Sequence, residues 1–120
     1  MEISLRSMLI AMIAIFIVDL VWLNTVGLYA LEMTKRIQGS AVVMRFGPAI
    51  VVYIALAYLL LQANTVTQAA LTGLATYAVY DMTSYSILKD YDPRIAIADT
   101  LWGGALFTIV YTVLRITKLV

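Results

Sequence analysis

Residues 46–80 read FGPAIVVYIALAYLLLQANTVTQAALTGLATYAVY, a run of 35 residues without one charged side chain. About 20 apolar residues of helix cross a bilayer core about 30 Å thick, so this run is too long for a single span. A polar patch divides it, in which Thr65 and Gln68 have the Thr-x-x-Gln spacing of a helix-capping box. We therefore predict two spans joined by a tight turn, over residues 46–62 and 65–88.

A further apolar segment precedes this pair, over residues 3–29. It is interrupted only by Arg6 at its start and by Asp19 in its middle. A cleaved signal peptide is the alternative interpretation. Asp19 breaks the apolar region, however, and no small-x-small cleavage site follows at the right place. We therefore interpret the segment as a membrane span.

The last apolar segment covers residues 93–114. Asp92 followed by Pro93 is typical of a helix N-cap and the first helical position. In the polar stretch 32–45, Gly39 is suited to end a helix that protrudes from the membrane. The short links favour antiparallel neighbours. The predicted fold is an all-α membrane protein, a four-transmembrane-helix antiparallel bundle.

The composition agrees with a single integral membrane domain over residues 1–120. Of the residues, 63% are hydrophobic and 12% charged, against about 25% charged in an average soluble domain. There is no Cys and no His, which excludes structural zinc sites, haem and iron–sulfur ligation, cysteine nucleophiles and histidine acid–base chemistry. The net charge of +1 gives no reason to expect nucleic acid as a partner. We predict no cofactor and no metal site.

Four spans place both termini on one side of a multi-pass protein, which we expect in the plasma membrane. Cytoplasmic loops carry an excess of Lys and Arg. The loops after the first and third spans hold five such residues and the terminal segments hold three, so the count favours both termini outside. The two groups are Lys35, Arg36, Arg45, Lys89 and Arg94, against Arg6, Arg115 and Lys118.

Three acidic residues fall inside predicted spans: Asp19, Asp81 and Asp99. A carboxylate at mid-bilayer costs about 2.5–3.5 kcal/mol even on lenient insertion scales. At 1.5 Å per residue, all three fall at a similar depth on the side of the basic loops. No basic residue lies at that depth, so either a carboxyl group is protonated or a cation lies among them. The bilayer and a proton or small cation are therefore the expected partners.

Side chains that donate hydrogen bonds accompany these acids. Trp22 follows Asp19 by three residues and Trp102 follows Asp99 by three, which makes each pair neighbours on a helix. On the third span, phenol and hydroxyl groups share or flank the face of Asp81. The candidate binding residues are Asp19, Asp81, Asp99, Tyr77, Tyr80, Thr83, Ser84, Trp22 and Trp102.

Purely structural interpretations of these residues stay open. Asp99 is close enough to the interface to be a solvated residue of the first turns. Asp81 is also explained by hydrogen bonds that fix helix packing. The two Trp residues fit an interfacial aromatic belt, and Tyr53 and Tyr58 of the second span fit packing or the same belt.

The ordered motifs resemble one family. They are Asp-x-x-Trp-Leu (Asp19–Leu23), Gln38-Gly39, Gly-x-x-x-Tyr-x-x-Tyr-Asp-x-Thr (Gly73–Thr83) and Asp-x-x-Trp-Gly (Asp99–Gly103). Together they resemble the small four-span membrane family of unknown function numbered twenty-one seventy-seven. The resemblance covers nearly the whole chain and implies the fold and the polar residues, but no activity. The family usually has Asn where this chain has Ser84, so a site that needs an amide would find only a hydroxyl.

Three hypotheses for function follow. The first is a transporter or channel that binds or conducts a proton or small cation. Because four helices leave little room for a private pathway, it implies a homo-oligomer. The second is a structural or accessory subunit of a membrane complex, in which the Asp cluster only fixes packing. The third, an intramembrane enzyme acting on lipid, is disfavoured because there is no His, Cys, metal motif or nucleophile elbow.

Overall fold

The computed structural model describes residues 1–120 as an all-helical chain without strands. In chain order the helices are α1 (Leu5–Leu23), α2 (Val26–Gln38), α3 (Phe46–Leu61), α4 (Val66–Ile87) and α5 (Pro93–Thr117). The last three begin and end within three residues of the segments predicted from the sequence. By length and hydropathy α1 and α5 qualify as membrane-crossing helices, while α3 is apolar but shorter.

The predicted helix starts are confirmed by their hydrogen bonds. The Thr65 hydroxyl accepts from the Gln68 backbone N–H at 3.1 Å and begins α4. The Gln68 side chain accepts from the backbone N–H of Asn64 at 2.8 Å, one residue before the position that a capping box uses. The Asp92 carboxylate accepts from the Arg94 backbone N–H at 2.8 Å, directly before Pro93 of α5.

The expected first span, 3–29, is not one continuous helix, because the chain breaks after Leu23. The Asn24 amide donates to the Leu20 carbonyl at 2.7 Å, and the Thr25 hydroxyl donates to the Val21 carbonyl at 2.6 Å. Such back-bonding offers carbonyls of the last turn an alternative to helical partners. A second helix, α2, follows the break and ends at Gly39, which has a left-handed φ of 74°.

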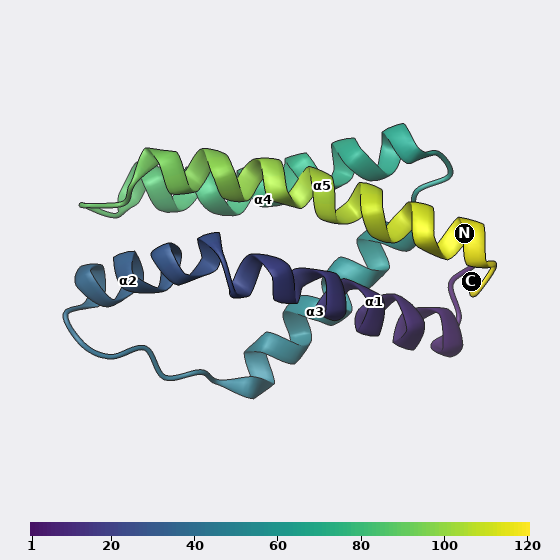
Figure 1. Ribbon diagram of the computed structural model, residues 1–120, viewed down its shortest axis with the longest axis horizontal. Helices are drawn as coiled ribbons and strands as arrows, with labels where there is room; N and C mark the ends of the chain where they lie inside the picture. The colour runs from purple at the N-terminus through teal and green to yellow at the C-terminus, as the bar shows by residue number, and fades with distance from the viewer.

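Helices α4 and α5 form a long antiparallel hairpin (Figure 1). Their backbones approach closely at Gly73 and Gly103. A Cβ atom on Gly73 would lie 2.8 Å from the Phe107 Cβ and 2.8 Å from the Gly103 carbonyl carbon. Small residues allow such close approach where membrane helices pack. This hairpin is therefore the most tightly packed part of the molecule.

Helices α1 and α2 run end to end along the hairpin, and α3 crosses α1 obliquely (Figure 1). Both termini lie at the end of the molecule where α3 turns into α4. Only 22 of 120 residues are buried, and Phe107, Ile15 and Leu60 are central among them. Large apolar side chains are exposed along α1, α3, α4 and α5. The molecule thus turns an apolar exterior outward, as a lipid-facing surface requires.

Candidate functional site

Asp19 joins three helices through its two carboxylate oxygens. It lies on α1 and is 8% exposed. Oδ2 accepts from the Tyr53 hydroxyl of α3 at 2.7 Å, and Oδ1 accepts from the Trp102 indole Nε1 of α5 at 2.9 Å. Since both oxygens have a donor, this carboxylate is held by neutral groups without a basic residue.

Aromatic rings hold the donors to Asp19 in place. The rings of Trp22 and Trp102 stack with centroids 5.8 Å apart and planes 16° from parallel. Phe16 packs edge-on against the ring of Tyr53, with centroids 5.6 Å apart. The indole that reaches Asp19 thus belongs to the distant Trp102, and Trp22, three residues away on the same helix, stacks on it.

Asp81 is the most deeply buried acid, 1% exposed on α4. Its Oδ1 accepts from the Tyr91 hydroxyl at 3.2 Å. Its Oδ2 is buried and has no donor. Thr100 lies in range, but its hydroxyl proton is already donated to the Ala96 carbonyl at 2.9 Å. Asp81 therefore has one oxygen free for a proton or another ligand.

Asp99 of α5 is the acidic neighbour of Asp81, and the two carboxyl groups lie close enough to interact with each other. A hydrogen bond between them requires that one carboxyl carries a proton. The one ion pair of the chain, Arg94–Asp92 at 2.9 Å, lies elsewhere at the start of α5. The Asp81–Asp99 pair, as we call it below, thus lacks a basic partner.

The three acids therefore form two adjoining groups instead of one shared cluster. Asp19 lies with Tyr53 and Trp102, and the Asp81–Asp99 pair lies with Tyr91. No set of three or more acidic side chains is placed to share one metal ion. What the pair can do chemically is hold a single proton or a weakly bound cation between two oxygens.

The remaining predicted residues lie at varied positions on α4. Tyr77 is half-buried against Gly103, within electrostatic range of both Asp19 and Asp99. Tyr80 is 66% exposed and lies close to the half-buried Ser84. Thr83 is exposed, and its side chain makes no hydrogen bond to any of the three acids. Tyr77 thus lies near both groups without a hydrogen bond to either, whereas Thr83 lies outside both.

Two residues at the site were not among the candidates, Tyr53 and Tyr91. Tyr53 lies in the apolar second span, where the sequence explains a tyrosine equally well by packing. Tyr91 lies in the link after α4, ten residues beyond Asp81, where no helical periodicity applies. Burial raises the pKa of the Tyr91 phenol, and the charge of Asp81 adds to this effect. Its hydroxyl therefore stays a hydrogen-bond donor at neutral pH.

The family model described as Predicted membrane protein (DUF2177) matches residues 4–116. The chain belongs to this family. The resemblance inferred from the ordered motifs is thereby confirmed, and so is the assignment to the membrane. No curated protein and no solved structure matches the chain.

In this DUF2177 protein the motif residues converge from three helices, and a fourth helix adds Tyr53. Asp19 and Trp22 come from α1, Gly73, Tyr77 and Asp81 from α4, and Asp99, Trp102 and Gly103 from α5. Tyr53 of α3 completes the first group. Ser84, where the sequence resemblance led us to expect Asn, lies beside Tyr80 and not at the buried Oδ2 of Asp81. The departure at Ser84 therefore leaves the Asp81–Asp99 pair intact.

Proposed function

We propose that this DUF2177 protein is a four-span membrane protein that binds a proton, or a small cation in its place, at the Asp81–Asp99 pair. The observation that carries the proposal is the Oδ2 atom of Asp81, which is buried and lacks a donor, on a carboxyl group that has Asp99 as its acidic neighbour. One proton placed between the two groups satisfies both. Intramembrane carboxylates commonly mark proton and ion pathways.

A four-span arrangement is supported by the dimensions and surface of the molecule. The longest extent is 44 Å, close to the roughly 40–45 Å of a bilayer with its headgroup regions. Apolar side chains are exposed on α3 and α4 as well as on the two longer apolar helices. In this arrangement the loops after α2 and α4 lie in the cytoplasm and both termini outside the plasma membrane, as the basic residues favour.

Tyr91 gives the pair a connection toward the aqueous side. Its hydroxyl bonds Oδ1 of Asp81 from the link between α4 and α5. A proton leaves the pair toward the aqueous side only after this phenol rotates, because its hydroxyl donates to Oδ1 and must turn its lone pair to Asp81 to accept a proton while it releases its own to water. Conduction across the whole membrane also needs a path on the far side. Because the core of the chain is filled by Phe107, Leu106 and Val110, that path belongs to a homo-oligomer interface.

A structural or accessory role is the second candidate, and Asp19 supports it. Both of its oxygens are satisfied by neutral donors from two other helices, so this group acts as a packing contact and leaves no vacancy for a ligand. In that case the whole polar interior would hold the bundle together and present it to a partner complex.

The test measures proton binding and proton flux separately, in the reconstituted full chain. Infrared spectroscopy at neutral pH should show the carbonyl stretch of a protonated carboxylic acid. The band should be absent in the double variant Asp81→Asn/Asp99→Asn and retained in Asp19→Asn. The matched control is Asp90→Asn, an exposed link residue with φ 68°, a conformation that Asn tolerates.

Flux is followed with a pH-sensitive dye inside liposomes under an imposed potential. The parent chain and Asp90→Asn should pass protons. The rate of proton flux should be at least about tenfold lower in the double variant, the equivalent of about 1.4 kcal/mol in the barrier. Absence of the infrared band in the parent chain overturns proton binding. A band without flux above empty liposomes overturns conduction and favours the structural role.

A further inference from the structure

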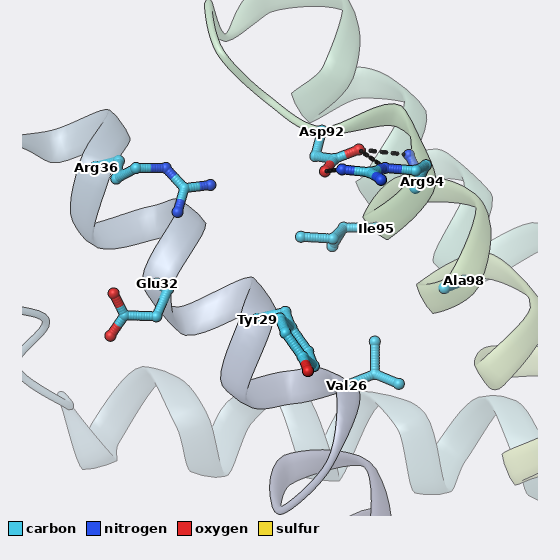
Figure 2. A pocket seen from close by; sticks show the side chains of 8 residues that line it. All are labelled: Val26, Tyr29, Glu32, Arg36, Asp92, Arg94, Ile95 and Ala98. Atoms are coloured by element: carbon cyan, nitrogen blue, oxygen red, sulfur yellow. Dashed lines mark hydrogen bonds and ion pairs between the residues drawn. The ribbon is translucent and has the colours of Figure 1, made fainter.

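A second feature lies apart from the acids, a cavity of about 460 Å³ between α2 and the start of α5 (Figure 2). Its volume lies within the roughly 300–1,000 Å³ of typical ligand pockets. One edge is charged and the other apolar. The lining residues are Val26, Tyr29, Glu32, Arg36, Asp92, Arg94, Ile95 and Ala98.

The apolar edge continues into a trough between α1 and α5. A second hollow of about 300 Å³ shares Val26 and Ala98 with the cavity, and all but one of its eight lining residues are hydrophobic. Its lining includes Trp22, Trp102 and Leu101. Polar cavity and apolar trough thus form one continuous amphipathic groove.

The charged edge presents one guanidinium group that is free for an anion, that of Arg36, while Arg94 donates from Nε and Nη2 to the Asp92 carboxylate at 3.2 and 2.9 Å. Arg36 has no carboxylate within ion-pair distance, since the one ion pair of the chain joins Arg94 and Asp92. The Arg94 side chain is 90% exposed. In Figure 2 the Arg36 guanidinium points toward the edge formed by Asp92 and Arg94, whereas the Glu32 carboxylate points away. Arginine is the residue best suited to bind phosphate oxygens.

We propose that this groove binds an anionic glycerophospholipid of the bilayer. Arg36 binds the headgroup, whose net negative charge no ammonium group offsets, and one acyl chain lies in the trough past Val26 and Ala98 and over the indoles of Trp22 and Trp102. The shape argues for a lipid, because a soluble phosphate would leave the apolar trough unfilled. The order of residues along the groove also agrees with a bound lipid, because basic residues belong at the depth of the headgroups and apolar residues at the depth of the acyl chains.

The two Trp residues of the chain, Trp22 and Trp102, both line the trough, so contact of a quencher with the trough is read from Trp fluorescence. The experiment reconstitutes the full chain in bilayers that contain a small fraction of lipid with brominated acyl chains, which quench indoles on contact. An anionic brominated glycerophospholipid is compared with a zwitterionic one at the same mole fraction. We expect the anionic lipid to be preferred about fivefold for each arginine that contacts it.

Two variants test the two halves of the groove against matched controls. Arg36→Gln should lower the anionic preference about fivefold, while Arg45→Gln, the same charge change outside the groove, should leave it unchanged. Ala98→Leu, in the trough, should reduce quenching by both lipids. Ala75→Leu, on the exposed face of α4, should not.

A measurement on the unaltered chain keeps the proposal testable if a variant fails to fold. Unbrominated anionic lipid should relieve the quenching at a lower mole fraction than unbrominated zwitterionic lipid does. Equal competition by the two lipids overturns the proposal. An equal loss of preference in Arg45→Gln and Arg36→Gln also overturns it, because it would reduce the effect to general surface charge.

Discussion

Asp19 illustrates how a membrane protein tolerates a buried carboxylate at the scale of one residue. Its two oxygens accept one phenol and one indole hydrogen bond, at 2.7 and 2.9 Å, from helices far apart in the sequence. A buried polar group that keeps all its partners contributes to a unique packing, whereas one that loses a partner is costly. The donors are therefore as important as the acid itself.

Tyr53→Phe tests this view. The change removes the hydroxyl that donates to Asp19 Oδ2 and leaves the ring contact with Phe16 in place. We expect a loss of about 1–2 kcal/mol in the free energy of unfolding, measured in detergent micelles. Tyr58→Phe is the control, because Tyr58 is 51% exposed and its hydroxyl makes no hydrogen bond. Equal effects of the two substitutions would contradict the role of the Tyr53–Asp19 bond.

At the scale of the element, the α4–α5 hairpin sets the distance between Asp81 and Asp99. The backbones meet at Gly73 and Gly103, where neither residue has room for a Cβ atom. The link between the two helices ends in the Asp92 N-cap, whose carboxyl has a pKa held below its usual value by hydrogen bonds from Arg94. The hairpin thus keeps the Asp81 and Asp99 carboxyl groups close to each other.

Gly73→Ala is therefore expected to push α4 and α5 apart. Its new methyl group would meet backbone at Gly103 and Cβ of Phe107, so we expect a loss of about 1–3 kcal/mol in thermal or denaturant unfolding. Gly47→Ala is the matched control, since no atom lies within 4 Å of its Cβ position in the first turn of α3. That variant should be neutral or slightly more stable. A stable Gly73→Ala protein would show that the close approach is dispensable.

At the scale of the whole molecule, the question is how many helices cross the bilayer. α1 and α5 qualify by length and hydropathy, and α3 and α4 expose apolar side chains without meeting the same criterion. Both termini lie at one end, together with the α3–α4 turn. Two or four spans are each consistent with termini on the same side, so the loops between them distinguish the two arrangements.

Cysteine labelling separates the two arrangements, because the chain has no native cysteine. Ser40→Cys, Asn64→Cys and Lys89→Cys each place a single thiol at an exposed residue between helices. With four spans, Asn64→Cys should react from the opposite face of sealed vesicles to the other two. If only α1 and α5 cross, all three should react from the same face, and the four-span proposal would be wrong.

The amino-acid sequence by itself determined the helical class, the membrane setting, the family and the starts of α4 and α5. These depend on local composition and on caps between residues a few positions apart, such as Thr65 with Gln68. It also identified Asp19, Asp81 and Asp99 as acids inside apolar segments, where the free-energy cost of a carboxylate calls for a structural or functional explanation. The break at Asn24 escaped prediction because apolar residues continue across it, and the competing hydrogen bonds of Asn24 and Thr25 leave no mark in hydropathy.

Only the tertiary structure decided which partners each acid has. Tyr53 and Trp102 lie 34 and 83 residues from Asp19, and nothing in local spacing selects them from the other aromatic residues. The division of the acids into a satisfied Asp19 and a pair with a free oxygen depends on which distant helices pack beside each acid. The groove between α2 and α5 depends on the same long-range packing. Hydrogen bonds and cavities between distant segments are properties of the packed helices, because backbone periodicity constrains only neighbours along the chain.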